Sequence, residues 1–356
     1  MDYTVKPLSN MQTGGGGGNK EEEYEAGILL GGFTSVSRPS LTPSTLIMKG
    51  FTETPQDVTS SIQGPKTFYS YISQLTLDDS IKTIGTYSFT NYSRLTSVKM
   101  PKNLQTIGGY AFRGCTSLTT LELPETVTNI GGYAFDGCTQ LAIDKLPSKV
   151  TSIGSYAFQS CSKITLTELP EGIKTIYNNS FYGCSNLALT KLPSKVTSIG
   201  SSAFKNCSKL ALTELPSGLT NIDANAFEYC SKLAIKSIPA GVTELKGYTF
   251  ISCGGITQLS MPSVTTILAS APAYGPFYNC KNIKAVWFGP NTTSSTVNGN
   301  VFYSSTLKKM FIDLPRATVE TYGFYSTFSS IIVCNDDEGF MTQAEFDAID
   351  WATYTE

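Results

Sequence analysis

The chain has 356 residues, of which 40% are hydrophobic, and it carries a formal net charge of −2. This balance supplies a core but no excess of positive charge, so we expect neither a nucleic-acid partner nor an electrostatic attraction to anionic membranes. Histidine, the commonest general base and metal ligand, is absent. We therefore predict a protein without catalytic residues, cofactor or metal.

Residues 1–70 form the first predicted region, an N-terminal segment without the regular spacing of the later residues. Its glycine run 14–18 and the acidic stretch 21–23 predict a flexible linker and a solvated patch. Residues 33–66, with apolar pieces such as 45–48, are expected to form a few strands or an N-terminal cap. The apolar stretch 26–33 is too short to span a bilayer, and no signal peptide is visible in the sequence given.

Residues 71–262 have a strict period of 23 residues. Eight phenylalanines, from Phe89 to Phe250, are separated by this interval, and a proline follows each of them by 12 residues. A fixed period of roughly 20–50 residues predicts a solenoid, in which each unit stacks on copies of itself. The predicted core positions include Phe112, Phe135, Phe158, Phe181, Phe204 and Phe227, with Cys115, Cys138, Cys161, Cys184, Cys207 and Cys230.

Each repeat is expected to be mainly β, with a parallel sheet on one face and short strands and turns on the other. In the repeat 115–137, the alternation at Leu118, Leu121 and Leu123 predicts a short strand that Pro124 ends. The small Ala134 should let the ring of Phe135 stack on its neighbour. In five repeats, from 141–146 to 233–238, the inward residue comes one position early, which predicts an irregular strand.

The nine cysteines are expected to be free thiols buried in the core. Seven of them recur at one repeat position, three residues after the phenylalanine, and an odd row cannot pair off completely. A redox-active or metal-binding row is the alternative, but CxxC pairs and histidines are absent.

Charged residues alternate in sign two positions before the proline. The row reads Lys99, Glu122, Lys145, Glu168, Lys191 and Glu214. We expect these side chains to neutralise one another across neighbouring strands, and a charged binding stripe is the alternative.

Tyrosines recur two positions before the phenylalanine, at Tyr87, Tyr110, Tyr133, Tyr156 and Tyr248. Half-buried stacking is the structural interpretation of this row. An exposed aromatic row is also what a protein or glycan partner would contact, so these tyrosines are the candidate contact surface.

Residues 263–334 are expected to form degenerate repeats and a C-terminal cap. Phe277 and Phe302 continue the repeat, 307–315 and 331–334 are predicted strands, and 317–325 is a predicted capping helix. Residues 335–356 are expected to be a C-terminal tail. Gly339 and Glu345 match part of a calcium-binding EF-hand loop, but Cys334 replaces its first aspartate and no calcium site is predicted.

The repeat L-P-x-x-V-T-x-I-G-x-x-A-F-x-x-C-x-x-L resembles the BspA-type leucine-rich repeat of bacterial surface proteins over roughly residues 72–315. It matches at 146–147, 150–151, 153–154, 157–158 and 161. The resemblance implies a curved leucine-rich repeat solenoid without catalytic residues. Family members are commonly exported, and several are implicated in adhesion.

These observations favour a non-enzymatic adhesion protein, at the cell surface or secreted, that contacts a host or cell-surface protein or glycan. One alternative is a virion or phage-tail component, structural or receptor-binding, which the glycine run would suit. A less favoured alternative is a glycan-active enzyme, which would need two carboxylates roughly 5–9 Å apart in a cleft.

Overall fold

The computed structural model describes residues 72–268, 275–292, 301–302, 307–316 and 331–353, together with the backbone of 23–24 and 45–48. The chain divides into two compact units, Met1–Ile164 and Thr165–Glu356, which we call the first and the second unit. The glycine run 14–18 and the predicted capping helix 317–325 lie outside the described residues.

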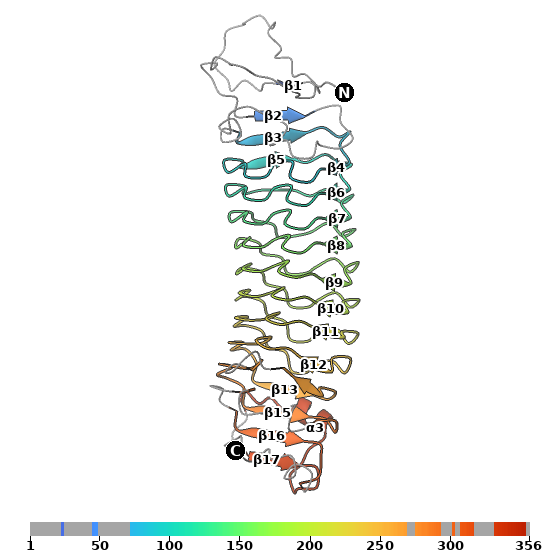
Figure 1. Cartoon of the computed structure of the whole chain (residues 1–356), viewed down its shortest axis with the longest axis vertical. Coiled ribbons are helices and arrows are strands. Elements are labelled where there is room, and N and C mark those ends of the chain that lie inside the picture. Colours follow the sequence, from blue (N-terminus) through green and yellow to red (C-terminus); the bar gives the residue numbers. More distant parts are fainter. Residues whose placement is uncertain are drawn as a thin grey trace, which may run out of the picture. The chain divides into compact units, whose positions relative to one another are not determined.

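The first unit contains two parallel sheets. One has the order β1-β2-β3-β5 and the other β4-β6-β7-β8, and Figure 1 shows them at different positions around the coil. Neighbouring strands pair at an offset of one repeat, as Thr106 does with Asn129. The bounds are β1 Glu23–Tyr24, β2 Thr45–Met48, β3 Gln74–Leu77, β4 Thr83–Ile84, β5 Ser97–Lys99, β6 Thr106–Ile107, β7 Asn129–Ile130 and β8 Ser152–Ile153. The expectation of strands or a cap within residues 33–66 is met by a strand at β2.

The second unit repeats this parallel arrangement with sheets β11-β10-β9, β12-β14 and β13-β15-β16-β17. The bounds are β9 Thr175–Ile176, β10 Ser198–Ile199, β11 Asn221–Ile222, β12 Glu244–Leu245, β13 Gln258–Met261, β14 Thr266–Ile267, β15 Ala285–Phe288, β16 Lys309–Ile312, β17 Ile331–Cys334 and α3 Gln343–Ala348. The strands expected at 307–315 and 331–334 are confirmed as β16 and β17. Each unit is thus a parallel β-solenoid, as the 23-residue period predicts.

The strand within each central repeat was predicted in the wrong place. Residues 118–123 form only an isolated bridge at Thr120, because the Leu118 N–H closes a turn onto the Cys115 carbonyl instead of joining a ladder. In the five repeats expected to be irregular, residues 141–146 and their counterparts contain no strand beyond an isolated bridge at Ser237. The recurring strand is instead a two-residue pair such as Asn129–Ile130, whose isoleucine is buried.

The predicted phenylalanine core is confirmed in both units. The centroids of Phe89, Phe112, Phe135 and Phe158 follow one another at 5.4, 5.5 and 5.3 Å. In the second unit, the stacks from Phe181 to Phe302 have separations of 5.1 to 5.7 Å. Repeated coils therefore bring identical rings into contact, and stacking adds to the burial of apolar surface.

The cysteines are free and buried, as expected. Each repeat thiol with a described contact donates to the carbonyl of the phenylalanine one coil earlier; Cys138 Sγ lies 3.1 Å from Phe112 O. Burial raises the pKa of Cys280 to about 12, and it raises the pKa of Cys115, Cys207 and Cys253 as well. A buried row of neutral thiols acts as small core filler with a weak hydrogen-bond donor.

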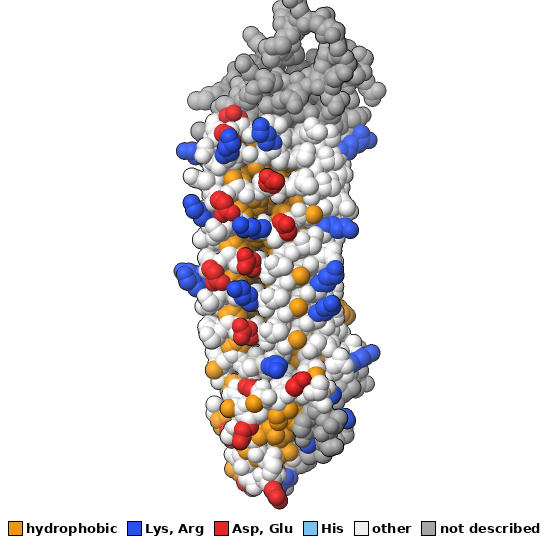
Figure 2. Space-filling model, turned by 180° about the vertical axis from the view of Figure 1, so that it is seen from behind, with side chains coloured by type: hydrophobic (Ala, Val, Ile, Leu, Met, Phe, Trp, Pro, Cys, Tyr) orange, Lys and Arg blue, Asp and Glu red, His pale blue; other side chains and the backbone are white. Residues whose placement is uncertain are grey.

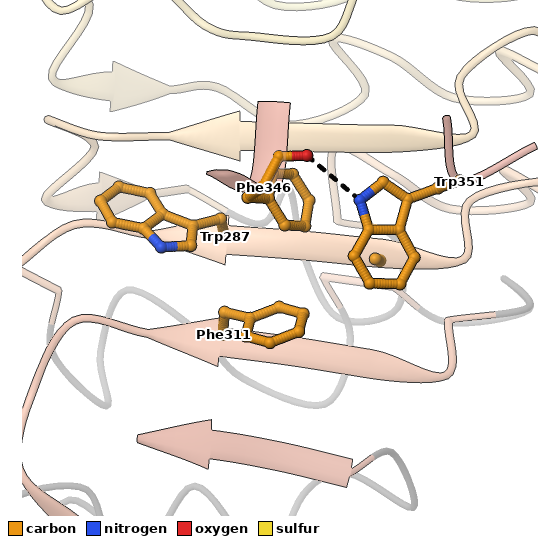
Figure 3. Close-up of a cluster of buried hydrophobic side chains, with 5 residues drawn as sticks. Trp287, Phe311, Phe346 and Trp351 are labelled. Carbon is orange, nitrogen blue, oxygen red and sulfur yellow. Dashed lines mark hydrogen bonds between the residues drawn. The ribbon is translucent and has the colours of Figure 1, made fainter. Parts of the chain in front are cut away.

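The last residues of the second unit fold onto its sheet. Thr342 and Glu345 form a capping box at the start of α3. The ring of Phe346 then packs 5.7 Å from that of Phe311 and 5.4 Å from that of Trp351, in a cluster that also holds Trp287 (Figure 3). Part of the segment 335–356 that the sequence suggests is a tail is thus packed, because α3 covers the apolar face of β15 and β16.

Candidate contact surface

Four tyrosines of the first unit form one continuous stack, which we call the tyrosine ladder: Tyr87, Tyr110, Tyr133 and Tyr156. Successive ring centroids lie 4.5, 4.5 and 4.3 Å apart, with planes within 16° of parallel. Tyr87 is 42% exposed and the other three are half-buried. Because each ring covers the face of the next, the ladder presents ring edges and hydroxyl groups to solvent.

The backbone holds these tyrosines in the left-handed region. Their φ angles are 57° to 61°, which is rare for bulky residues because Cβ approaches the following carbonyl. A hydrogen bond between coils fixes the conformation: the Tyr110 N–H donates to Gly132 O at 2.9 Å. The preceding turn requires glycine, since a Cβ on Gly131 would lie 2.6 Å from Gly109 N.

Three coils of the second unit carry a smaller residue at the same position, whereas Tyr248 repeats the tyrosine with a φ of 64°. Asn179, Ser202 and Asn225 have φ angles of 54° to 62°. For the four tyrosines the conformation costs about 1–2 kcal/mol each, or about 4–8 kcal/mol together, whereas three ring stacks contribute about 0.5–1.5 kcal/mol each, or about 1.5–4.5 kcal/mol together. Stacking therefore offsets only part of the backbone strain and does not by itself explain tyrosine here.

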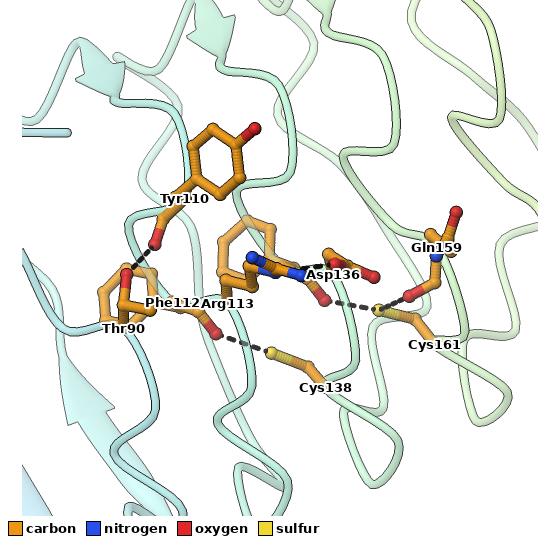
Figure 4. Close-up of polar contacts among 9 residues, drawn as sticks. Thr90, Tyr110, Phe112, Arg113, Asp136, Cys138, Gln159 and Cys161 are labelled. Carbon is orange, nitrogen blue, oxygen red and sulfur yellow. Dashed lines mark hydrogen bonds and ion pairs between the residues drawn. The ribbon is translucent and has the colours of Figure 1, made fainter. Parts of the chain in front are cut away.

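An ion pair flanks the centre of the ladder. Arg113 Nε lies 3.0 Å from Asp136 Oδ2, and the guanidinium lies 5.6 Å and 5.8 Å from the ring centroids of Tyr110 and Tyr133. Figure 4 shows this pair beside the row of Phe112 and Cys138, with the Tyr110 ring turned away from that core. Asp136 is buried, while the Arg113 side chain is 49% exposed. This pair was not predicted from the sequence, although Arg113 and Asp136 carry opposite charges one repeat apart.

Tyr133, near the centre of the ladder, keeps its proton at physiological pH. Burial raises the pKa of Tyr133 above its ordinary value, and its neighbours Tyr156 and Tyr110 raise it further. Its phenol can therefore both donate and accept hydrogen bonds.

The fifth candidate tyrosine lies outside the ladder. Tyr248 is half-buried and belongs to the second unit, so the four-ring ladder does not include it.

None of the ion pairs among the described residues joins two members of the Lys99-to-Glu214 row; Lys145 instead lies 4.0 Å from Glu125. On the face drawn in Figure 2, acidic and basic groups interleave without forming a patch of one sign. Neighbours in the row therefore form no direct ion pair among the described residues, and their mutual neutralisation across coils stays a prediction.

Two hollows of the described surface are small. One, of about 200 Å³, is lined by Asp78, Asp79 and Lys99 in the first unit. A hydrogen bond from the Lys102 N–H lowers the pKa of Asp79, which is therefore ionised at neutral pH and cannot act as a general acid. The other, of about 320 Å³, lies in the second unit beside Lys281, Lys284 and Lys308.

Residues considered for calcium binding serve the C-terminal helix instead. The Glu345 carboxylate accepts hydrogen bonds from the Thr342 N–H and hydroxyl, both at 2.8 Å. Among the described residues, no group of three or more histidine, cysteine or acidic side chains is placed to hold a metal ion. No helix in the described part of the chain is long and apolar enough to cross a membrane.

Comparison with known proteins agrees with this geometry. The chain matches the family described as BspA type leucine rich repeat region (6 copies) over residues 62–188, 151–275 and 237–331. A leucine-rich repeat protein from Bacteroides ovatus is 21% identical, with 83% of this chain and 93% of that one covered and a TM-score of 0.52. This likeness shows the fold.

Two further solved structures are more distant in shape. A leucine rich cell surface protein from Faecalibacterium prausnitzii is 21% identical, over 83% of this chain and 89% of that one, with a TM-score of 0.46. The leucine rich repeat protein of T. pallidum is 25% identical over 47% of this chain and 78% of that one, with a TM-score of 0.38. No curated protein matches the chain.

Proposed function

Because the chain belongs to the BspA-type leucine-rich repeat family, we propose that it is a non-enzymatic adhesion protein, displayed at a cell surface or secreted. Its partner is a protein or glycan of a host or of another cell, and the contact surface is the tyrosine ladder. Repeat families of this type generally serve as binding scaffolds.

The proposal rests on one observation: the ladder tyrosines adopt a left-handed backbone conformation, which is rare for bulky residues. Strained conformations concentrate at functional positions, where the side chain serves something other than folding. Asn179 and Asn225 occupy the same conformation in the second unit, and asparagine is better suited to it than tyrosine, although Tyr248 keeps the tyrosine there. Exposed tyrosine is also among the residues enriched at the energetic centres of interfaces.

Binding assays with paired variants test the proposal. The purified chain is applied to arrays of extracellular-matrix proteins and glycans and to whole cells, alongside the variant Tyr110→Ser/Tyr133→Asn. These substitutions give the ladder the residues that the second unit has at Ser202 and Asn225, so the fold should be retained. We expect the variant to lose at least about tenfold in affinity, the effect of removing one or two interface anchors.

The matched control is Tyr229→Asn. Tyr229 is also left-handed, with φ 61°, and is 48% exposed, but it lies outside the ladder. This control should bind as the unmodified chain does. Equal binding by the ladder variant and the unmodified chain would remove the ladder as the contact surface.

A further inference from the structure

We propose that the hollow beside Lys281, Lys284 and Lys308 binds an acidic sugar, a ring that carries a carboxylate or a sulfate, within a glycan chain. This site lies in the second unit. It is separate from the tyrosine ladder, so it adds a second binding activity to the proposed function. Its lining is completed by Thr257, Asn282 and Ala352.

Backbone pairing places two of these lysines on consecutive coils, one above the other. The Lys284 N–H donates to Thr257 O at 2.8 Å, and the Lys308 N–H donates to Lys284 O at 2.9 Å. These bonds extend the register in which Ala285 pairs with Lys309. Parallel strands repeat about every 4.8 Å, so the two lysines are direct neighbours. Like charges directly opposite each other destabilise a sheet.

Elsewhere the solenoid places opposite charges in such neighbouring positions. Four ion pairs of the described residues join a basic and an acidic side chain one repeat apart: Lys102–Asp79, Arg113–Asp136, Lys205–Glu228 and Lys246–Asp223. Lys284 and Lys308, by contrast, form no ion pair among the described residues. This local departure from charge pairing favours an anionic ligand from outside the chain.

The C-terminal segment forms one wall of the hollow and holds one cation in place. Lys284 Nζ donates to Ala352 O at 2.7 Å. Because that carbonyl is neutral, the ammonium group keeps its full charge and two further N–H donors. Asp350, in the same segment, instead accepts hydrogen bonds from the Ala352 N–H and the Thr353 hydroxyl, both at 3.1 Å. The cation is therefore positioned before a ligand arrives.

The size and lining of the hollow favour a sugar over other anions. Its volume of about 320 Å³ is at the low end for small-molecule sites, so it suits a single ring. Neutral polar groups stand beside the cations. One is the Asn282 amide, whose Nδ2 donates to Gly254 O at 2.7 Å and whose oxygen is left as an acceptor for a sugar hydroxyl. A nucleic acid would need an aromatic side chain to stack a base, and the described lining contains none.

Calorimetric titration of the full chain with four polymers of matched length tests the site. The polymers are dextran sulfate, polygalacturonate, unmodified dextran and polyglutamate. We expect at least one of the two acidic glycans to bind, more weakly as salt is added because exposed charges are screened. Their relative affinities distinguish sulfate from carboxylate.

Two results of the titration would overturn the proposal. One is the absence of binding by either acidic glycan. The other is an affinity for dextran or polyglutamate equal to that for the acidic glycans, because the site would then not recognise an acidic sugar.

Paired lysine variants locate the binding. Lys284→Gln/Lys308→Gln should lower the affinity for the acidic glycan at least about tenfold, the effect of losing a hydrogen bond to a charged group. The matched control Lys174→Gln/Lys195→Gln removes the same charge from two exposed lysines of the second unit that do not line the hollow. It should bind as the unmodified chain does. Equal losses in both variants would show that binding follows net charge alone and would overturn the site.

Lys308→Glu tests whether the lysines are placed for a ligand or for folding. It gives Lys284 an acidic neighbour on the next coil, as in the four ion pairs above, and removes the repulsion between like charges. We expect at least about a tenfold loss of acidic-glycan binding, with a melting temperature equal to or above that of the unmodified chain. Retained binding, or a clearly lower melting temperature, would contradict the proposal.

The two binding activities can be separated. The ladder variant Tyr110→Ser/Tyr133→Asn should bind the acidic glycan as the unmodified chain does, and Lys284→Gln/Lys308→Gln should keep the partners that need the ladder. Loss of acidic-glycan binding in the ladder variant would move that binding to the ladder. This result would overturn the lysine site while leaving the proposed function standing.

Discussion

Two regions of the molecule carry the same repeat with different surfaces. The coils from Tyr110 to Asp136 in the first unit correspond to those from Ser202 to Glu228 in the second, four 23-residue repeats later (202 − 110 = 92). In both, phenylalanines stack and cysteines donate to phenylalanine carbonyls. Both also hold a partly buried ion pair, Arg113–Asp136 in one and Lys205–Glu228 at 2.8 Å in the other.

The difference lies at the left-handed position. One region places tyrosine there and the other places serine or asparagine, while the core beneath is unchanged. Because the carbonyl and N–H groups that join the coils belong to the backbone, the side chain at this position is free to vary. The repeat thus separates the residues that determine the fold from those available for recognition.

The largest expected effect tests the shared core with pH. The folded pKa of Cys280 is about 12 against an ordinary 9.0, and that of Cys115 is also raised. The neutral thiols therefore stabilise the fold fully below pH 9, and this contribution is lost as the pH rises through the folded pKa. Cys280 alone should lose about 4 kcal/mol by pH 12. Denaturant titrations by circular dichroism across this range measure it.

Serine variants provide the control for the alkaline titration. In Cys115→Ser and Cys280→Ser the hydroxyl can donate to the same carbonyl without ionising in this range. Each should make stability less dependent on pH. A variant in one unit that behaved unlike its counterpart would show that the two cores are not equivalent.

Removing one ring from each region compares the cores directly. Phe135→Ala and Phe227→Ala each delete a fully buried ring that stacks on both neighbours. We expect each to cost about 3–5 kcal/mol of unfolding free energy, measured by urea denaturation. If the two losses of unfolding free energy differ by more than the usual variation between similar buried sites, the two regions do not share a common core.

The two ion pairs should differ in how much stability is lost when the acidic residue is removed. Asp136→Ala leaves an Arg113 that is 49% exposed and can rehydrate, whereas Glu228→Ala leaves a Lys205 that is only 24% exposed. We therefore expect a loss of about 1 kcal/mol for the first and about 2 kcal/mol for the second. The reverse order, in the same denaturation assay, would show that exposure of the remaining cation does not set the cost.

The smallest effect is expected at the position where the regions differ. Tyr133→Asn removes two ring stacks and relieves backbone strain, and Ser202→Tyr, between Asn179 and Asn225, does the opposite without gaining a stacked neighbour. The first should change stability by under about 1 kcal/mol, and the second should destabilise by about 1 kcal/mol or more. A loss above about 3 kcal/mol for Tyr133→Asn would make the ladder a structural element.

The sequence predicted the features that periodicity alone determines. Identical residues at a 23-residue spacing must meet when coils stack, so the rows of Phe135 and Cys138 and the parallel pairing were accessible from the sequence. The tyrosine stack was accessible for the same reason, but its left-handed backbone was not, because a hydrogen bond to the next coil determines it. The packing of α3 was also missed, although Thr342 and Glu345 had the spacing of a capping box.

The thiol contact with the preceding coil bears on how genes of this kind change length. Each repeat cysteine with a described thiol contact reaches the phenylalanine carbonyl one repeat earlier, and no disulfide ties distant cysteines together among the described residues. Recombination that inserts or deletes a whole repeat therefore gives every remaining coil a neighbour of the same kind. Length variants of the solenoid would keep their core intact, so the number of coils on either side of the tyrosine ladder can change without any change in the core.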